Sequence, residues 1–295
     1  MKKKLSYHFY FLFFILCIAT FWLVFKTTLF DPIFIEVFGQ SKISSTDEIE
    51  NEPIVFIHGY DGSNWTFFTT TLRYSLTDFA TRSISLTVLE NGEIECHGTY
   101  NKNVKRPMIR INFDNPTAEI TNNSEWLEKA MTYLKTTYSI KRVSIVAHSY
   151  GGLTFTKFAQ HFDETKYPAI DKFIAIGTPF NGSDLAKNGK TPYDLGPNGP
   201  KKESVYFSNL FNHRMDLSPN LNFLNIVGDL DNGSRSDGAV AVDSALSARY
   251  IFKPENYQEK LFYGIFAQHS LLHMNFKVDT TIQHFLTTKP IKKSV

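Results

Sequence analysis

The chain has 295 residues, of which 42% are hydrophobic and 20% charged, and its formal net charge is +2. This length and composition suit a folded protein with a sizeable core, and they exclude a disordered chain, a collagen and a coiled coil. The near-zero net charge gives no basic surface of the kind that nucleic-acid-binding proteins use. We therefore expect no nucleic-acid partner.

The two cysteines, Cys17 and Cys96, lie far apart in different kinds of sequence. Cys17 belongs to an N-terminal apolar run and Cys96 to the remainder of the chain, so we expect no disulfide between them. Neither has a second ligand at the spacing of a metal site. We therefore predict packing roles for both cysteines, and neither a metal ion nor an organic cofactor.

Residues 1–30 differ from the rest of the chain. The lysines Lys2–Lys4 precede an apolar run of 21 residues, Leu5–Phe25, that contains no formal charge. As a helix this run would be about 31 Å long, which is close to the hydrocarbon thickness of a bilayer. It is longer than the apolar core of a signal peptide and lacks a small-x-small cleavage site, which favours an uncleaved signal anchor.

The lysines also predict how the chain is oriented across the membrane. Because three of them precede the apolar run and only Lys26 follows it directly, the N-terminus is expected in the cytoplasm and the remainder outside the cell. We therefore predict a single-pass membrane protein with a signal anchor over residues 1–30, a polar tether over 31–52 and a folded domain over 53–290. Cleavage of the anchor would instead give a secreted protein.

The folded domain begins with a buried strand. Pro53–Ile57 is a continuous apolar run, as expected of a strand covered on both faces. Ser63 or Asn64 is then placed to cap a helix with apolar residues on one side. Two strand patterns follow, at 83–89 and 93–99, and the Asn91-Gly92 pair between them is the strongest short hairpin signal.

Strands alternate with helices through the rest of the domain. The predicted elements are a strand at 108–113, a helix from Asn123 or Ser124 to Tyr138, a strand at 143–147, a helix after Gly152, a strand at 172–176, a polar loop or cap at 181–202, strands at 221–227 and 258–266, and a last helix near 278–286. This alternation predicts an α/β fold: a mostly parallel central sheet flanked by helices, with an inserted β-hairpin region and a small cap or loop insertion.

The strongest chemical signal follows the strand at 143–147. Ala147-His-Ser-Tyr-Gly151 matches the nucleophile elbow G-x-S-x-G, with alanine in the first small position. In such an elbow a strand turns sharply into a helix, which strains the backbone of the nucleophile and holds its side chain above the sheet edge. The residues two before and two after must be small, or they would collide across the turn. The pattern predicts Ser149 as the nucleophile.

A second motif lies after the first strand. His58-Gly59-Tyr60 stands where folds of this kind place one donor of an oxyanion hole. We expect the hole to consist of the backbone N–H groups of Tyr60 and of Tyr150, the residue after the predicted nucleophile. His58 is expected to support this loop, and no proton-transfer role is expected for His148.

The base should come last in the chain order serine, acid, histidine. Two histidines, His269 and His273, lie between the strand at 258–266 and the last helix. His269 comes first after the strand, where a base must lie over the serine, whereas His273 is placed to begin or cap a helix. We therefore favour His269 as the base over His273.

Three aspartates follow the strand at 221–227 and are candidates for the acid. Asp237 lies in a tight turn with a glycine that leads back into apolar sequence, which would hold its carboxylate rigidly toward an imidazole. Asp229 directly ends the strand and is the second choice. Asp231 is third, and we interpret it as a turn former because the surrounding sequence lacks the register and the closing glutamate of an EF-hand.

In their order and spacing these motifs resemble the α/β-hydrolases, and within them a membrane-attached "cell surface hydrolase" family of Gram-positive bacteria. The stretches that carry the resemblance are Phe56–Tyr60, Ala147–Gly152, Gly177–Gly182, Asn225–Asp231 with Ser236–Gly238, and His269–His273. A looser resemblance links the chain to bacterial lipases. The first resemblance implies an α/β-hydrolase fold, and the likeness to bacterial lipases implies Ser149, Asp237 and His269 as a catalytic triad.

We therefore predict a serine hydrolase of the carboxylesterase or lipase type, which cleaves a small-molecule or lipid-like ester through an acyl-enzyme. Two alternatives stay open: an acyltransferase that uses the same triad, and a membrane-tethered binding module without chemistry. Residues 181–202 are too polar for an obvious lipid-binding lid, and Val205–Phe211 fits an ordinary packed helix better than the lining of an acyl pocket. The sequence predicts neither the natural ester nor the oligomeric state.

Overall fold

A computed structural model of the chain describes residues 51–288. The predicted signal anchor and nearly all of the predicted tether lie outside these residues. Within residues 51–288, none of the helices has the length and apolar character needed to cross a membrane.

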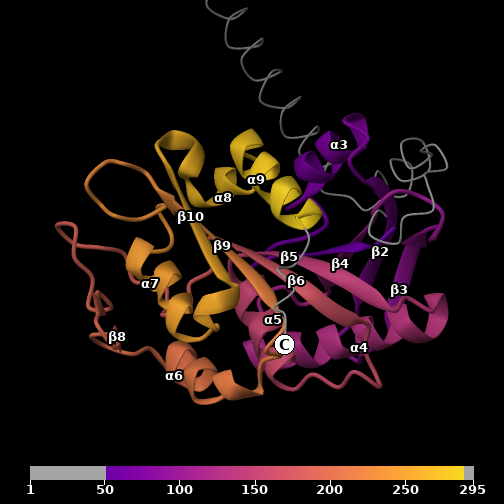
Figure 1. Cartoon of the computed structure of the whole chain (residues 1–295), viewed down its shortest axis with the longest axis horizontal. Helices are drawn as coiled ribbons and strands as arrows, with labels where there is room; N and C mark the ends of the chain where they lie inside the picture. The colour runs from indigo at the N-terminus through magenta and orange to yellow at the C-terminus, as the bar shows by residue number, and fades with distance from the viewer. Residues whose placement is uncertain (1–50, 289–295) are drawn as a thin grey trace, which may run out of the picture.

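An eight-stranded sheet forms the centre of the domain, in the order β10-β9-β6-β5-β1-β4-β2-β3 (Figure 1). Every pairing in it is parallel except the one between β2 and β3, which are joined by the predicted Asn91-Gly92 turn. The strands are β1 (Ile54–Ile57), β2 (Thr81–Val88), β3 (Ile94–Gly98), β4 (Pro107–Phe113), β5 (Arg142–His148), β6 (Ala169–Ile176), β9 (Asn222–Asp229) and β10 (Tyr257–Tyr263).

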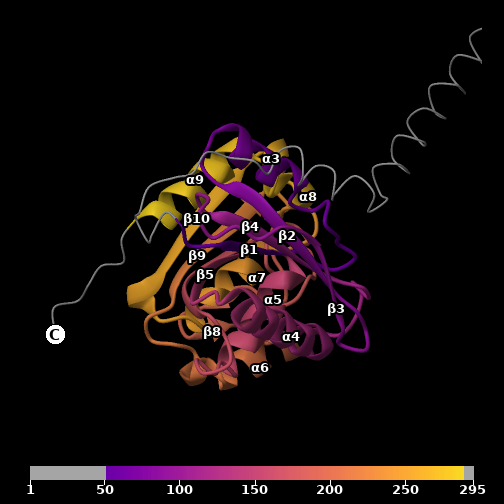
Figure 2. The same cartoon turned by 90° about the vertical axis from the view of Figure 1, so that its right-hand side faces the viewer.

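Helices cover both faces of this sheet (Figure 2). The α-helices are α3 (Phe68–Leu76), α4 (Ile120–Tyr138), α5 (Tyr150–Gln160), α6 (Val205–Asn212), α7 (Val242–Leu246), α8 (His269–Leu272) and α9 (Phe276–Thr287), with short 3-10 turns at Arg214–Asp216, Ser247–Tyr250, Pro254–Asn256 and Ile265–Ala267. The first strand shows how the two faces arise. Its alternate residues Val55 and Ile57 pack with α4 and α5, whereas Ile54 and Phe56 pack with α3 and α9.

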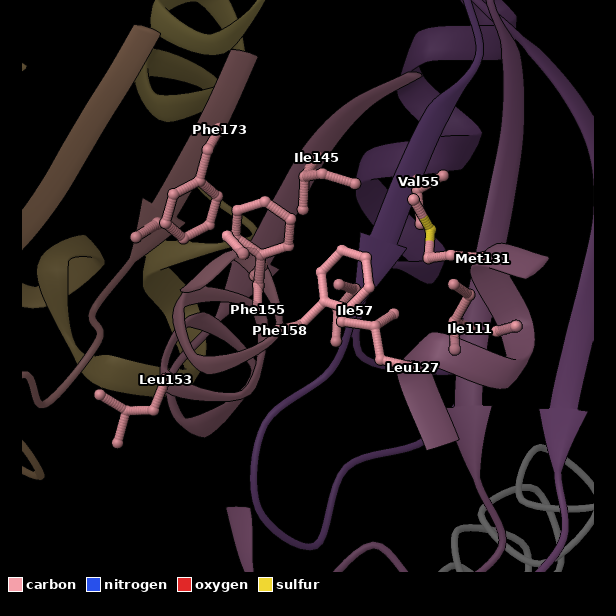
Figure 3. Packing of buried hydrophobic residues seen from close by; sticks show 14 of the residues in the cluster. Val55, Ile57, Ile111, Leu127, Met131, Ile145, Leu153, Phe155, Phe158 and Phe173 are labelled. Carbon is pink, nitrogen blue, oxygen red and sulfur yellow. The ribbon is translucent and has the colours of Figure 1, made fainter. Parts of the chain in front are cut away.

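The structure confirms the predicted architecture: a mostly parallel sheet, helices on both sides and a β-hairpin after the first helix. Figure 3 shows the core on the α4 and α5 side, where Leu127 and Met131 meet Ile57 and Ile111 from the sheet. The polar segment 181–202 forms an irregular insertion with one short hairpin, β7 (Leu195–Gly196) and β8 (Gly199–Pro200).

Two predicted helix starts are wrong. The first helix begins at Phe68, and not near Ser63 or Asn64, because residues 64–67 form turns before it. Asn64 does not cap the helix, since its side chain accepts hydrogen bonds from Ser85 and Asn112 of the sheet. The second helix starts earlier than predicted, at Ile120, so that Asn123 and Ser124 lie inside its first turns, where both are buried.

An aromatic stack fills the core beneath β6 and β9. The ring of Phe223 lies 3.9 Å from that of Phe252 and 4.9 Å from that of Phe173, measured between centroids. Phe223 is fully buried, so protein atoms enclose its ring on all sides. The stack therefore fixes the position of β9, the strand that leads to the predicted acid.

We predict that Phe223→Ala lowers the free energy of unfolding by about 3–5 kcal/mol, because the substitution removes a buried ring and leaves a cavity. Urea unfolding followed by circular dichroism measures this change. Val205→Ala is the control, because Val205 is 75% exposed and its truncation should be nearly neutral. A loss below about 1 kcal/mol for Phe223→Ala would contradict the packing described here.

Candidate active site

Ser149 lies in the turn between β5 and α5 with φ 54° and ψ −125°. A positive φ is uncommon for a residue with a side chain and is strained unless its surroundings enforce it. Here the backbone N–H of Ser149 donates to the carbonyl oxygen of Ile176 at the end of β6, with an N···O distance of 2.8 Å. The structure therefore has the strand–turn–helix geometry that the elbow motif predicts.

Small residues surround this turn because the backbone of β1 passes close to it. A Cβ atom on Gly151 would lie 2.8 Å from the carbonyl oxygen of Ile57, and one on Gly59 would lie 2.8 Å from the Cβ atom of Ser149. Real Cβ atoms essentially never approach so closely. Ala147 replaces the first glycine of the usual motif, and its methyl group is accommodated in full burial.

The three side chains predicted to act together form a hydrogen-bonded chain. The His269 Nε2 atom lies 3.0 Å from the Ser149 Oγ atom, and the His269 Nδ1 atom lies 2.7 Å from the Asp237 Oδ2 atom. Because a carboxylate oxygen only accepts, the Nδ1–H of His269 donates to Asp237, and Nε2 is left to accept the hydroxyl hydrogen of Ser149. This is the arrangement that a serine needs for activation by an imidazole.

Asp237 is held by its own turn. Its Oδ1 atom accepts the backbone N–H groups of Ala239, at 2.9 Å, and of Val240, at 2.7 Å. Its carbonyl oxygen accepts the backbone N–H of His269, at 2.9 Å, so the main chains of acid and base are bonded as well as their side chains. The carboxylate is 1% exposed. The tight turn that favoured Asp237 in the sequence is thus present in the structure.

The alternative acid Asp229 and the alternative base His273 are not part of this hydrogen-bonded chain. The Asp229 carboxylate accepts the backbone N–H of Asp231 at 3.0 Å, which closes a turn after β9. Asp231 adopts φ 56°, in agreement with its predicted role as a turn former. His273 is buried at the C-terminal end of α8, so it ends a helix and does not begin one. Asn275 caps the following helix, α9.

The loop after β1 faces the serine from the other side. The rings of Tyr60 and Tyr150 meet edge to face, with centroids 6.0 Å apart. Tyr150 is the first residue of α5, so its N–H belongs to the positive end of the helix dipole. Within residues 51–288, the N–H groups of Tyr60 and Tyr150 donate to no protein acceptor. Both groups are therefore free to bind an oxyanion.

His58 supports this loop, as expected. The backbone N–H of Phe113 donates to His58 Nε2 at 3.2 Å, which leaves Nδ1 to donate to the carbonyl oxygen of Gly59 at 2.8 Å. Burial lowers the pKa of His58, so the ring stays neutral and keeps this tautomer. His58 thus connects the end of β4 to the loop that carries Tyr60.

A buried polar network also holds this loop, and sequence analysis did not identify it. The Asn64 side-chain oxygen accepts hydrogen bonds from Ser85 and Asn112, each at 2.5 Å, and its carbonyl oxygen accepts one from Arg110 at 3.1 Å. The signal in the sequence is the presence of Arg110 and Asn112 inside the otherwise apolar strand β4, next to the polar residue Ser85 of β2. A buried polar side chain in such a strand requires a partner.

The comparisons with known proteins agree with this fold. The product of the lin2722 gene of Listeria innocua is 28% identical, with a TM-score of 0.75 over 82% of this chain and 96% of that one. A Lactobacillus plantarum WCFS1 protein described as a cell surface hydrolase is 22% identical, with a TM-score of 0.64 over 83% of this chain and 93% of that one. No curated protein matches the sequence.

The family comparison covers most of the chain. Residues 41–289 match the model of DUF915, which is described as an alpha/beta hydrolase of unknown function. The matched range includes the whole described domain and with it Ser149, Asp237 and His269. The fold, the elbow and the hydrogen-bonded side chains are all consistent with that description. The chain therefore belongs to the DUF915 family of α/β-hydrolases.

Proposed function

We propose that this protein is a serine esterase that hydrolyses carboxylic esters through an acyl-enzyme on Ser149. The observation that carries the proposal is the continuous hydrogen-bonded chain from Ser149 through His269 to the buried Asp237. A binding module would have no need to hold a strained serine against an oriented imidazole. Family membership supports a hydrolase, and the choice of an ester bond is our own inference from the site.

In the first half of the reaction, Ser149 Oγ attacks the carbonyl carbon of the ester while His269 Nε2 takes the hydroxyl proton. The resulting oxyanion is bound by the N–H groups of Tyr60 and Tyr150. Asp237 keeps the imidazole in the correct tautomer and stabilises its positive charge. When the tetrahedral intermediate collapses, His269 returns the proton to the leaving alcohol.

The second half repeats these steps with water. His269 Nε2 removes a proton from a water molecule, whose oxygen attacks the acyl carbon bound to Ser149. The second tetrahedral intermediate uses the same two N–H groups. Its collapse releases the carboxylic acid, and His269 returns the proton to Ser149 Oγ. All proton transfers pass through one nitrogen atom, so no additional acid or base is needed.

Tyrosine rings lie around the serine, and their apolar surface favours a substrate with an apolar portion. Tyr150 lies between Tyr60 and Tyr206, with edge-to-face contacts at 6.0 Å and 6.1 Å between ring centroids. Tyr60 is 61% exposed and Tyr206 is 38% exposed, so both rings offer surface to a ligand. Rings of this kind bind alkyl and aryl groups and keep a polar hydroxyl at the water boundary. A small-molecule or lipid-like ester would match the apolar surface of these rings.

We predict that Ser149→Ala and His269→Ala each lower kcat for a p-nitrophenyl ester by at least about 10³-fold, and Asp237→Asn by about 10⁴-fold. A fluorophosphonate should label the full chain at Ser149, as mapped by mass spectrometry, and this labelling should be lost in the His269 variant. Asp229→Asn is the matched control, because Asp229 only closes a turn. Full activity in Ser149→Ala would rule out the proposal.

A second prediction concerns the bond between acid and base. Gly177 has φ 57°, and a Cβ atom there would lie 3.1 Å from Asp237 Oδ2 and 3.3 Å from His269 Nδ1. Gly177→Ala should push these two groups apart and lower kcat by about 10–100-fold, as small displacements in an active site do. Steady-state kinetics on a p-nitrophenyl ester measures this effect.

Gly189→Ala separates this displacement from backbone strain. Gly189 also has a positive φ, of 72°, but a Cβ atom there would meet only the carbonyl of Gly233 and the side chain of Arg235, at 3.5 Å and 3.8 Å. Both variants should lose about 1 kcal/mol of stability. Only Gly177→Ala should lose turnover, and equal kcat in the two variants would contradict the prediction.

We also propose that the N-terminal apolar segment attaches this domain to the outer face of the cytoplasmic membrane. The support is the charge pattern around Leu5–Phe25, with lysines before the run. In intact cells that express the full chain, an external protease should then cleave the domain, while a cytoplasmic marker protein stays protected. A domain that is protected until the cells are lysed would overturn this orientation.

A further inference from the structure

A row of three imidazole rings extends from the proposed base into the core. His148 is the last residue of β5 and directly precedes Ser149. Its ring centroid lies 4.7 Å from that of His269 and 4.6 Å from that of His273. His148 and His273 are both buried. The reaction described above uses neither of them.

His148 makes one polar contact that bears directly on the base. Its Nε2 atom lies 3.1 Å from the main-chain carbonyl oxygen of His269. A carbonyl oxygen only accepts, so Nε2 of His148 carries the proton and donates it. Burial lowers the pKa of His148 well below its ordinary value, so the ring is neutral and Nε2–H is its single N–H group.

With this contact, both main-chain polar groups of His269 are hydrogen-bonded. The backbone N–H of His269 donates to the Asp237 carbonyl oxygen, and the carbonyl oxygen of His269 accepts from His148. The restraint matters because His269 is the first residue of α8, a helix of only four residues. A helix this short has little stability of its own, because a single turn carries the unfavourable free energy of helix nucleation without the gain from elongation.

We propose that His148 is a positioning residue for His269: it moves no proton, and through its Nε2–H it holds the main chain of the base in register with Ser149. This role rests on the proposed esterase function. The register matters because the imidazole must meet the serine on one side and the carboxylate on the other at the same time. A shift of the peptide of His269 would lengthen one of these bonds.

His273 provides a matched comparison within the same row. Its ring is buried to a similar extent, and burial lowers its pKa to about 4, so it too is neutral near pH 7. Within residues 51–288, its Nδ1 atom has no hydrogen-bond partner. His273 therefore shares the packing of His148 and lacks the hydrogen bond to His269.

The test uses the full chain with the substitutions His148→Phe, His148→Gln and His273→Phe. His148→Phe keeps a ring and removes the donor, and should lower kcat by about 10–100-fold with little change in KM. His148→Gln removes the ring but can place its amide N–H where Nε2–H stands, and should restore most of kcat. His273→Phe should leave kcat near that of the wild type. The rate of fluorophosphonate labelling at Ser149 should follow the same order.

A spectroscopic readout separates positioning from packing. The low-field proton resonance of the His269–Asp237 hydrogen bond should shift or broaden in His148→Phe and persist in His148→Gln and His273→Phe. The proposal is overturned if His148→Phe keeps its kcat, if His148→Gln is as slow as His148→Phe, or if His273→Phe loses as much as His148→Phe.

Failure of the esterase proposal gives a different result. If the wild-type chain neither hydrolyses esters nor labels at Ser149, both proposals fall. If the wild-type chain is active and Ser149→Ala is not, while all three histidine variants turn over normally, only the positioning role falls. The Ser149→Ala control therefore tells the two failures apart.

Discussion

The site depends on one steric constraint: the turn at Ser149 must approach the ends of two other strands closely. Glycines at 59, 151 and 152 allow this, since a side chain at any of them would collide with the backbone of β1, with Ser149 itself or with Thr178. The positive φ of Ser149 is kept because β1, β5 and β6 are already fixed in the sheet. The strain at the serine is thus supported by the packing of the whole domain, and not by the turn alone.

The same closeness explains why histidine side chains bond to the main chain around the site. Where strands end, their last backbone groups have no ladder partners, and side chains must satisfy them. His58 does this between β4 and the loop of Tyr60, and His148 does it between β5 and α8. In both cases a neutral ring joins two segments that are distant in sequence. His58 and His148 therefore connect segments of the main chain, whereas His269 is hydrogen-bonded to Ser149.

Much of this could be predicted from the sequence, because parallel strands bring their carboxyl ends to one edge of a sheet. Pro53–Ile57 and the strand before Ser149 both read as buried strands of a parallel sheet, so the residues that follow them must meet. The chain order serine, acid, histidine then limits the candidates for the acid and the base. The starts of α3 and α4 could not be predicted in this way. Asn64 suits a helix cap equally well by residue type, and only the approach of Ser85 and Asn112 from distant strands decides its role. The role of His148 depends in the same way on a three-dimensional contact.

The strand order has a consequence for how the protein loses activity on heating. Ser149 follows β5, which has neighbours on both sides. Among the described residues 51–288, by contrast, His269 follows β10, which lies at the edge of the sheet and pairs only with β9. Edge elements open at a lower free-energy cost than central ones, because fewer contacts must be broken. Opening of β10 alone would carry the imidazole away while the serine, its turn and the central core stay folded. We therefore expect the contact between His269 and Ser149 to be lost on heating before the centre of the sheet unfolds.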